Sequence, residues 1–331
     1  MPNWARVGRF CAPLGGARWA LLRGAWTGAR LVDRYGFEPW GIFFILYAII
    51  KNMPELPEVE TVRRGLDRTV LNRPISHVEV FHPRTMRRQP GGESEFIKIL
   101  TGATFVATAR RGKFLWLPTN LGDAMLAHLG MSGQLLVVPP GGEDPKHLRA
   151  RITFDDEGPE LQFVDQRTFG YVMAERDGAQ LPSLVAHIAP DPLDNATNDE
   201  LFVTALHRRG EIKKLLLDQQ VISGIGNIYA DEALWRSEIH GRTPGIALSE
   251  EKRRELLDNS RQVLLDAIEA GGTSFDALYV GIDGEQGWFE RSLDAYGRAG
   301  QECRRCGEII QREKWGGRSS HWCPGCQKLP T

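Results

Sequence analysis

Four cysteines near the C-terminus constrain this chain more than any other sequence feature. They form two Cys-x2-Cys pairs, Cys303 with Cys306 and Cys323 with Cys326, and 16 residues separate the pairs. This spacing is typical of two knuckles that hold one zinc ion with four thiolates in tetrahedral geometry. Two disulfides are the alternative, but no secretory signal supports an oxidising compartment. We therefore expect one structural Zn²⁺ in a C-terminal ribbon, with Cys11 outside the site.

The length and charge of the chain set further bounds. Its 331 residues suffice for two or three domains with a sizeable core. Apolar residues make up 42% and charged residues 25%, which excludes a disordered chain and a multi-span membrane protein. The net charge is −1, so any surface for nucleic acid must be local. The cysteine ribbon supplies one such basic surface, formed by Arg304, Arg305, Arg312, Lys314, Arg318, His321 and Lys328.

The first 52 residues differ from the rest. They carry a net charge of +5, whereas the remaining 279 residues carry −6. Their apolar run at 40–50 has 11 residues, too few to span a bilayer, which takes about 20. The run also lies far from the start and lacks the cleavage pattern of a signal peptide. An upstream region translated from a wrong start, a removable leader and a functional anchor remain as interpretations. We expect that residues 1–52 are not part of the mature protein.

Residues 53–188 carry the pattern of a β-sandwich behind one helix. The apolar side chains of 57–70 recur every three or four residues, which predicts the helix. Asp155–Gly158 has the composition of a hairpin turn. Eight short apolar segments predict strands at 75–81, 104–109, 114–118, 124–129, 134–138, 150–154, 160–164 and 170–174.

From Asn198 onward the pattern becomes helical. One helix contains 215–217, a second covers 228–235, and a long one covers 249–270 and ends at Gly271. The long helix directs four apolar side chains inward, namely Leu256, Leu257, Leu264 and Ile268. A stretch rich in proline and aspartate at 189–195 predicts a hinge. We expect an α+β multidomain protein with a β-sandwich domain at 53–188, a helical domain at 196–290 and a zinc ribbon at 291–331.

A glycine-containing turn, 223–227, lies between two of these helices. Such a turn can present backbone N–H groups to a phosphate, although a tight interhelical connection explains the glycines equally well. Basic side chains precede it at Arg208, Arg209, Lys213 and Lys214. A helical turn that is combined with a basic ribbon is typical of a unit that grips a nucleic-acid backbone.

The segment 53–61, Met-Pro-Glu-Leu-Pro-Glu-Val-Glu-Thr, carries the most specific chemical signal. Inside a longer chain it is only a loop that enters a helix. As a true N-terminus it would lose Met53 and leave Pro54 with a free secondary amine, whose reference pKa is about 7.7–8.0. Such an amine attacks an aldehydic or glycosidic carbon to form an iminium. Glu55 and Glu58 would supply carboxylates for proton transfer and charge stabilisation beside it.

In their order and spacing, these motifs resemble those of bacterial formamidopyrimidine-DNA glycosylases from about Met53 to Lys328. The matching segments are 53–61, 110–113, 128–133, 165–170, 224–230, 296–298 and the four-cysteine ribbon. The resemblance implies a bifunctional DNA glycosylase/AP lyase with a helix-two-turn-helix domain. It also implies excision of oxidised purines followed by β- and δ-elimination. The implied partner is duplex DNA with an oxidised base or an abasic site, bound by a cytoplasmic monomer without a redox or nucleotide cofactor.

The resemblance also implies roles for individual residues. Pro54 is the nucleophile that attacks C1′, Glu55 protonates the sugar oxygen, and Glu58 supports Glu55. Lys113 is a second proton donor and phosphate contact, and Arg318 assists the second elimination. The implied DNA contacts are His147, Arg167, Arg209 and Asn227, and we add Lys213 from the basic patch.

Met131, Arg167 and Phe169 resemble the triad that fills the gap left by an extruded base, a role that suits apolar side chains and an arginine. Without the resemblance, Met131 and Phe169 would be taken for ordinary core residues. The sequence departs from the family pattern at Thr168, where many relatives have a second arginine. It departs again at Glu285, in a loop that helps to read the flipped base, so the preferred lesion stays open.

Three alternatives remain. A relative similar to endonuclease VIII would act on oxidised pyrimidines, although Leu56 and Phe169 argue against it. A lesion-binding protein without catalysis would result if residues 1–52 stay attached, because the nitrogen of Pro54 is then a tertiary amide. A generic zinc-ribbon DNA binder would leave the pattern of Pro54, Glu55 and Lys113 unexplained.

Overall fold

The computed structural model describes residues 54–194, 198–273 and 288–329, which belong to one compact unit. The extension at 1–52 and Glu285 lie outside the described residues.

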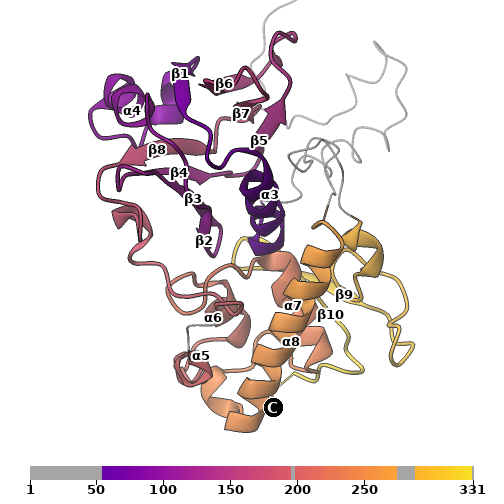
Figure 1. Cartoon of the computed structure of the whole chain (residues 1–331). Coiled ribbons are helices and arrows are strands. Elements are labelled where there is room, and N and C mark those ends of the chain that lie inside the picture. Colours follow the sequence, from indigo (N-terminus) through magenta and orange to yellow (C-terminus); the bar gives the residue numbers. More distant parts are fainter. Residues whose placement is uncertain (1–53, 195–197, 274–287, 330–331) are drawn as a thin grey trace, which may run out of the picture. The chain divides into compact units, whose positions relative to one another are not determined.

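The first part of the described chain, up to residue 194, comprises α3 (Leu56–Thr69), β1 (Ile75–Val80), η2 (Pro83–Met86), α4 (Gly92–Leu100), β2 (Ala109–Arg111), β3 (Phe114–Pro118), β4 (Ala124–His128), β5 (Gly133–Val138), β6 (Leu148–Phe154), β7 (Glu160–Asp165), β8 (Tyr171–Glu175) and η3 (Ser183–Val185) (Figure 1). The second part comprises α5 (Asp199–Ala205), α6 (Ile212–Leu217), α7 (Asn227–Arg236), η4 (Gly245–Ala247), α8 (Glu250–Glu269), η5 (Phe289–Ser292), β9 (Gln311–Trp315) and β10 (Arg318–Trp322).

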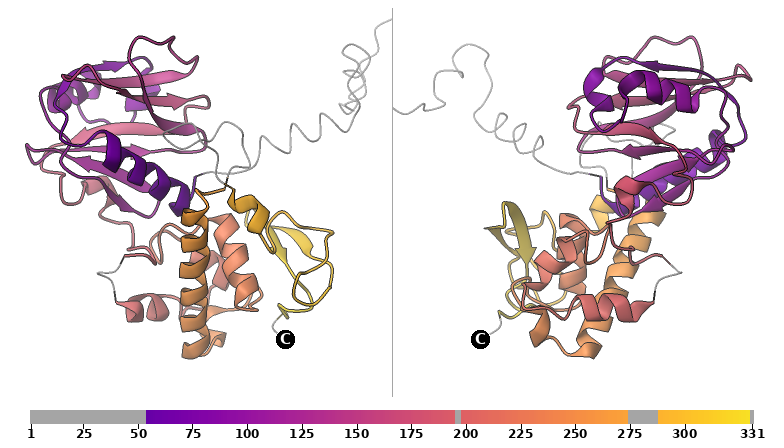
Figure 2. Two further views of the ribbon diagram at one scale, coloured as in Figure 1. Left: turned by 45° about the vertical axis from the view of Figure 1, so that its right-hand side comes forward. Right: turned by 90° about the vertical axis from the view of Figure 1, so that its left-hand side faces the viewer.

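The strands of the first part form two antiparallel four-stranded sheets, ordered β1-β6-β7-β5 and β2-β3-β4-β8. Figure 2 shows the two sheets stacked as layers. Buried and partly exposed residues alternate along β6, as in a strand with one face on the core. The core between the layers includes Phe96, Leu115 and Phe154. The predicted sandwich is confirmed, as is the turn at 155–158 between β6 and β7.

Two local predictions in this domain differ from the structure. The strand expected at 104–109 is wrong, since Thr104 and Phe105 make only single bridges to different partners and β2 begins at Ala109. Helix α4 was not predicted, although its Phe96, Ile99 and Leu100 are buried. Their spacing of three and four residues was the available signal.

Helix α3 connects the sandwich with the helical domain. Its first residue, Leu56, packs into the core of the helical domain, whereas Val59, Val62 and Leu66 pack into the core of the sandwich. Both cores therefore fix the start of this helix. Since Glu55 immediately precedes it, a glutamate at this position is held between two domains.

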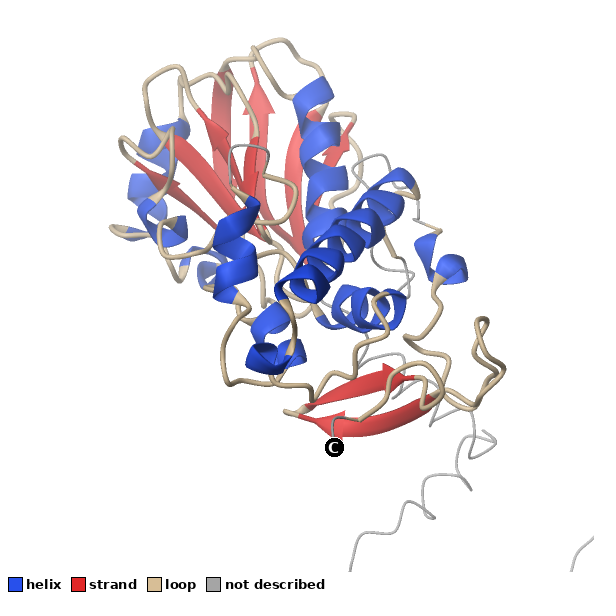
Figure 3. Cartoon of the chain, turned by 90° about the horizontal axis from the view of Figure 1, so that it is seen from below, coloured by secondary structure: helices blue, strands red, loops and turns tan. Residues whose placement is uncertain are grey.

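The helical domain and the ribbon follow the predicted order. Helix α8 begins after its N-cap Ser249, and its four predicted inward residues are buried. Strands β9 and β10 form a two-stranded antiparallel hairpin (Figure 3). Trp235 of α7 packs against this ribbon in a small core with Cys303, Ile310 and Cys323. Among the described residues, none of the helices has the length and apolarity that a membrane span requires.

Candidate active site

Glu58 fastens the entry of α3 to the helical domain. Its Oε2 accepts a hydrogen bond of 2.9 Å from the backbone N–H of Glu55. Its Oε1 accepts from the hydroxyl of Tyr229 at 2.6 Å and from the backbone N–H and hydroxyl of Thr273, both at 2.8 Å. Charged groups stabilise such hydrogen bonds more than neutral ones do. Glu58 therefore positions Glu55 and the buried Pro54.

Glu55 is the carboxyl group best suited to act as an acid. It is buried, and its Oε1 accepts a hydrogen bond of 3.3 Å from Ile228 at the N-terminus of α7. Its buried Oε2 has no hydrogen-bond partner among the described residues. Burial raises the pKa of Glu55 to about 7; Lys113 opposes this rise and Glu58 adds to it. A carboxylic acid with this pKa still holds its proton near neutral pH.

Two glycines of the 223–227 turn make room for this approach. A Cβ atom on Gly226 would lie 2.0 Å from Cδ of Glu55, and one on Gly224 would lie 2.4 Å from Cδ1 of Leu56. The carbonyl of Gly224 also accepts a hydrogen bond of 3.1 Å from the backbone of Leu56. The N–H of Ile228, the second residue of α7, points at the carboxyl of Glu55, and these close approaches support the tight interhelical connection. The expectation of a phosphate at this turn stays a prediction.

A buried network holds the turn that carries Lys113. Asp191 accepts hydrogen bonds from the backbone N–H of Gly112 at 3.1 Å and from the guanidinium of Arg110 at 2.8 Å. Arg110 also forms an ion pair of 3.0 Å with Glu60 of α3. The Arg-Arg-Gly-Lys motif thus links the turn between β2 and β3 to α3 and to the predicted hinge segment.

Lys113 lies among the charges of the site. Burial lowers its pKa; the negative charge of Glu55 opposes this effect, and the positive charge of Arg318 adds to it. The charge of Lys113 also acts on His128 of β4. Burial lowers the pKa of His128 to about 4, and the charges of Lys113 and Arg87 act in the same direction. His128 is therefore a neutral imidazole at physiological pH.

Arg318 and Asn227 reach the site from the ribbon and from α7. Arg318 is exposed at the start of β10, close enough to lower the pKa of Lys113. The side-chain amide of Asn227 donates a hydrogen bond of 2.9 Å to the carbonyl of Ser319. Six predicted residues therefore gather at one place: Pro54, Glu55, Glu58, Lys113, Asn227 and Arg318.

The three predicted gap-filling residues occupy adjoining loops of the sandwich. The guanidinium of Arg167 lies over the ring of Phe169 at 5.2 Å, and Phe169 is 42% exposed. Met131 is partly buried on the neighbouring loop. Asp165 ties the loops together, since it accepts hydrogen bonds from Ser132 at 2.5 Å and from the backbone N–H of Arg167 at 3.1 Å. The ordinary-core interpretation of Phe169 is wrong, because a large part of its ring faces solvent.

Of the remaining predicted DNA contacts, His147 and Arg209 are at least partly exposed, whereas Lys213 is buried. His147 is partly buried, and its carbonyl accepts a hydrogen bond of 2.9 Å from Asp165 near the gap-filling loops, whereas Arg209 is exposed between α5 and α6. The prediction for Lys213 is wrong. Its side chain is 0% exposed and its Nζ lies 2.6 Å from Asp231, so it cannot touch a phosphate in this arrangement. A basic run in a sequence does not reveal which of its side chains turns inward.

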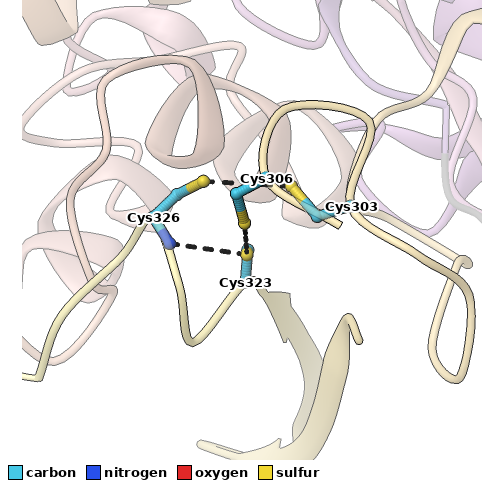
Figure 4. Close-up of side chains that lie close together, drawn as sticks. All are labelled: Cys303, Cys306, Cys323 and Cys326. Carbon is cyan, nitrogen blue, oxygen red and sulfur yellow. Dashed lines mark hydrogen bonds between the residues drawn. The ribbon is translucent and has the colours of Figure 1, made fainter. Parts of the chain in front are cut away.

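The four cysteines of the ribbon converge on one point (Figure 4). Their sulfur atoms all lie within 4.8 Å of one another, with 3.4 Å between Cys306 and Cys323 and 3.9 Å between Cys303 and Cys326. Four sulfurs at about 2.3 Å from a tetrahedral zinc ion would be about 3.8 Å apart. None of these four cysteines is in a disulfide. The residues present therefore fit a structural metal site and exclude the disulfide alternative.

Loss of one thiolate should remove the metal. We expect Cys306→Ser to lower the bound zinc from one ion per chain to well below one, because three ligands hold zinc much more weakly than four. DNA affinity should fall by about a hundredfold, since the ribbon that carries Arg318 loses its anchor. Metal analysis by atomic absorption and a DNA-binding titration check this. Both variants are made in the full chain, where Cys11→Ser is the matched control and should keep one zinc ion per chain.

Several residues of the site escaped the sequence analysis. Tyr229 and Thr273 bind Glu58, Asp191 holds the Lys113 turn, and His128 lies beside Lys113. Tyr229 and His128 fall within the matching segments 224–230 and 128–133, so these motifs were the available signal. Asp191 and Thr273 had none, because their partners lie 79 and 215 positions away in the sequence.

Comparisons with protein families match three parts of the chain. Residues 53–172 match the N-terminal domain of formamidopyrimidine-DNA glycosylase, and residues 188–278 match its H2TH domain. Residues 300–329 match a zinc finger found in FPG and IleRS.

Individual proteins give the same result. The formamidopyrimidine-DNA glycosylase of Salinispora arenicola is 55% identical over 279 residues, which cover 84% of this chain and 97% of that protein. The corresponding protein of a Nocardioides species is 56% identical over 281 residues, covering 84% and 95%. Lactococcus lactis Fpg in complex with abasic-site DNA is 34% identical, with a TM-score of 0.74 over 83% of this chain and 100% of that one. The same enzyme with DNA that contains an oxidised pyrimidine has a TM-score of 0.75, also at 34% identity over 83% and 100%.

Proposed function

The chain belongs to the formamidopyrimidine-DNA glycosylase family and is therefore a base-excision-repair DNA glycosylase with AP lyase activity. From this premise we propose that it excises oxidised purines through a Schiff base at Pro54. The proposed substrates are duplexes with 8-oxoguanine or a ring-opened formamidopyrimidine. One observation carries the proposal. The buried carboxyl of Glu55, with a pKa of about 7 and an unpartnered oxygen, follows Pro54 directly and shares the site with Lys113.

The reaction requires a free amine on Pro54. In the full chain this nitrogen is a tertiary amide without a nucleophilic lone pair, so the working enzyme begins at Met53 and loses that methionine. The freed secondary amine attacks C1′, the bond from C1′ to the base breaks, and an iminium joins the sugar to Pro54. Residues 51–331 form a compact unit, and the relatives match almost their whole length to this part of the chain. A chain started at Met53 therefore retains the family fold.

Glu55 supplies the proton for ring opening. Its carboxyl is protonated at and below neutral pH, and it donates to O4′ of the sugar as the ring opens and the iminium forms. Glu58 fixes the backbone of Glu55, and the start of α7 orients one carboxylate oxygen and leaves the other for the substrate.

Lys113 and Arg318 provide positive charge at the site. Both eliminations release a phosphate that departs with the electrons of a C–O bond, so nearby cations stabilise the charge that develops. A proton leaves C2′ as the C3′–O3′ bond breaks in β-elimination, and a proton leaves C4′ as the C5′–O5′ bond breaks in δ-elimination. We assign Lys113 as a second proton donor and phosphate contact, and Arg318 to the second elimination. The metal held by the four cysteines supports the ribbon and takes no part in these steps.

The DNA-binding part of the proposal uses exposed and partly buried residues. Arg167 and Phe169 with Met131 fill the gap left by the extruded base, while Asn227, His147 and Arg209 contact the backbone. Phosphate contacts by basic side chains make affinity fall steeply with salt. The proposal assigns one protein monomer to each lesion.

Borohydride trapping tests the proposal. The chain started at Met53 is mixed with a duplex that carries one 8-oxoguanine opposite cytosine, and borohydride reduces the iminium to a stable amine. We expect a covalent protein–DNA band, with the adduct mapped to Pro54 by peptide mass. The full chain should give no band, because its Pro54 is an amide.

The controls separate the alternatives. A duplex with an oxidised pyrimidine tests the activity of an endonuclease VIII-like enzyme, which becomes the better assignment if only this duplex is trapped. Tight binding of both duplexes without a band from a zinc-loaded protein would contradict the catalytic proposal and indicate a lesion-binding protein. A band of equal strength from the full chain would contradict the assignment of Pro54.

A further inference from the structure

A buried ion pair lies in the helical domain where this domain packs against the ribbon. The ammonium of Lys213 in α6 lies 2.6 Å from Asp231 in α7, and their side chains are 0% and 1% exposed. Burying two charges costs desolvation energy, and an apolar pair of similar size often stabilises a protein as well or better. The proposed reaction does not use this pair, so its energetic cost requires another role.

Additional bonds from the pair go to consecutive residues of β10. Asp231 accepts a hydrogen bond of 2.9 Å from the backbone N–H of His321, and the imidazole of His321 lies 3.2 Å from the same carboxylate. The hydroxyl of Ser320 donates to Asp231 at 3.4 Å. Lys213 donates to the carbonyl of Ser319 at 3.2 Å. Each of the three residues that follow Arg318, 319–321, is thereby bonded to Lys213 or Asp231.

Arg318 depends on this anchor for its place. Its own side chain is exposed, and within the part of the chain that the structure describes β10 pairs only with β9, in a two-stranded hairpin. Such a hairpin is marginally stable in isolation, so its docking determines where its first residue lies. Asn227 adds a second bond to the carbonyl of Ser319 from the start of α7. Lys213 and Asn227 therefore both donate to the carbonyl of Ser319, the residue that follows Arg318.

We propose that Asp231, paired with Lys213, is a positioning residue for Arg318 and thereby sets how often β-elimination is followed by δ-elimination. This inference rests on the proposed function. Without the pair, Arg318 shifts away from the departing 5′ phosphate, while Pro54, Glu55 and Lys113 keep their places on other elements. The Schiff base then forms normally, but the second C–O bond breaks slowly and the β-product accumulates.

The test uses Asp231→Asn in the chain started at Met53, with a duplex that contains one abasic site. Two quantities are measured on the same sample: the rate of borohydride trapping and the ratio of δ- to β-elimination products. We expect trapping within about twofold of the unmodified chain and a δ-to-β ratio about tenfold lower. Arg242→Ala is the matched control, because it breaks the exposed pair with Glu313 on β9 and leaves β10 untouched. Its ratio should not change.

A double variant separates positioning from stability. Asp231→Asn leaves Lys213 buried without its counter-charge and lowers stability, whereas Lys213→Met with Asp231→Asn removes both charges. We expect the double variant to regain thermal stability and to keep the low ratio. Recovery of the normal ratio together with stability would overturn the inference, as would an unchanged ratio in Asp231→Asn. If the unmodified chain itself forms no trapped adduct, the proposed function fails first and this inference falls with it.

Discussion

Replacing Glu55 with glutamine should slow excision of 8-oxoguanine by about a hundredfold to ten-thousandfold, the usual contribution of a positioned general acid. Glutamine has nearly the same shape and keeps an oxygen for the N–H of Ile228, but it holds no acidic proton for the sugar. DNA affinity should change little, because Glu55 is buried rather than part of the exposed binding surface. Single-turnover kinetics with the chain started at Met53 check this prediction.

The pH dependence gives an independent signature of the same proton. Burial raises the pKa of Glu55 to about 7, and the acid must be protonated to act, so the rate should fall about tenfold per pH unit above pH 7. This alkaline limb should disappear in Glu55→Gln. An unchanged alkaline limb in the variant would mean that another group supplies the proton.

The same pKa also predicts an effect on stability. An unfolded glutamate loses its proton near pH 4.5, whereas folded Glu55 keeps it to about pH 7. The folded state therefore binds more protons in this window, and stability is lost as the pH rises from 4.5 through 7. A shift of this size corresponds to about 3 kcal/mol in the free energy of unfolding at pH 8. Glu55→Gln should recover much of it, so the variant should be more thermostable and less active.

The features that the sequence predicted depend on neighbours in the chain. The metal site follows from two short cysteine spacings, and the long helix follows from its apolar periodicity and from Gly271 at its end. The sandwich follows from short apolar segments separated by turn residues. The strand expected at 104–109 failed because bridges to two distant segments determine that backbone.

The site was predicted through motifs, and the limits of that approach have a physical cause. A motif names the residues Arg110, Gly112 and Lys113, but it does not reveal that Asp191 holds them together from the hinge segment. The basic run near Lys213 suggested a DNA contact, yet Asp231, 18 positions later, draws this ammonium into the interior. Such long-range pairing is a property of the folded chain and leaves no local signal.

Gly226→Ala should abolish most of the activity without touching a catalytic residue. The backbone of Gly226 has φ −116° and ψ −163°, an extended conformation that alanine adopts without strain. The added methyl group would instead lie 2.0 Å from Cδ and 2.1 Å from Oε1 of Glu55. These atoms are at the end of a flexible side chain, so the carboxyl moves and the fold survives. Excision should fall at least a hundredfold while DNA binding persists.

A double-mutant comparison shows whether the loss acts through Glu55. If Gly226→Ala works only by displacing that carboxyl, then combining it with Glu55→Gln should cost no more than Glu55→Gln alone. If the losses of excision rate add up in the double variant, Gly226→Ala also acts on another part of the protein, for example the turn that precedes α7. Gly142→Ala is the control, because a Cβ atom there meets no other atom within 4 Å, and its rate should equal that of the unmodified chain. Normal excision by Gly226→Ala would mean that Glu55 does not need the position it occupies beside α7.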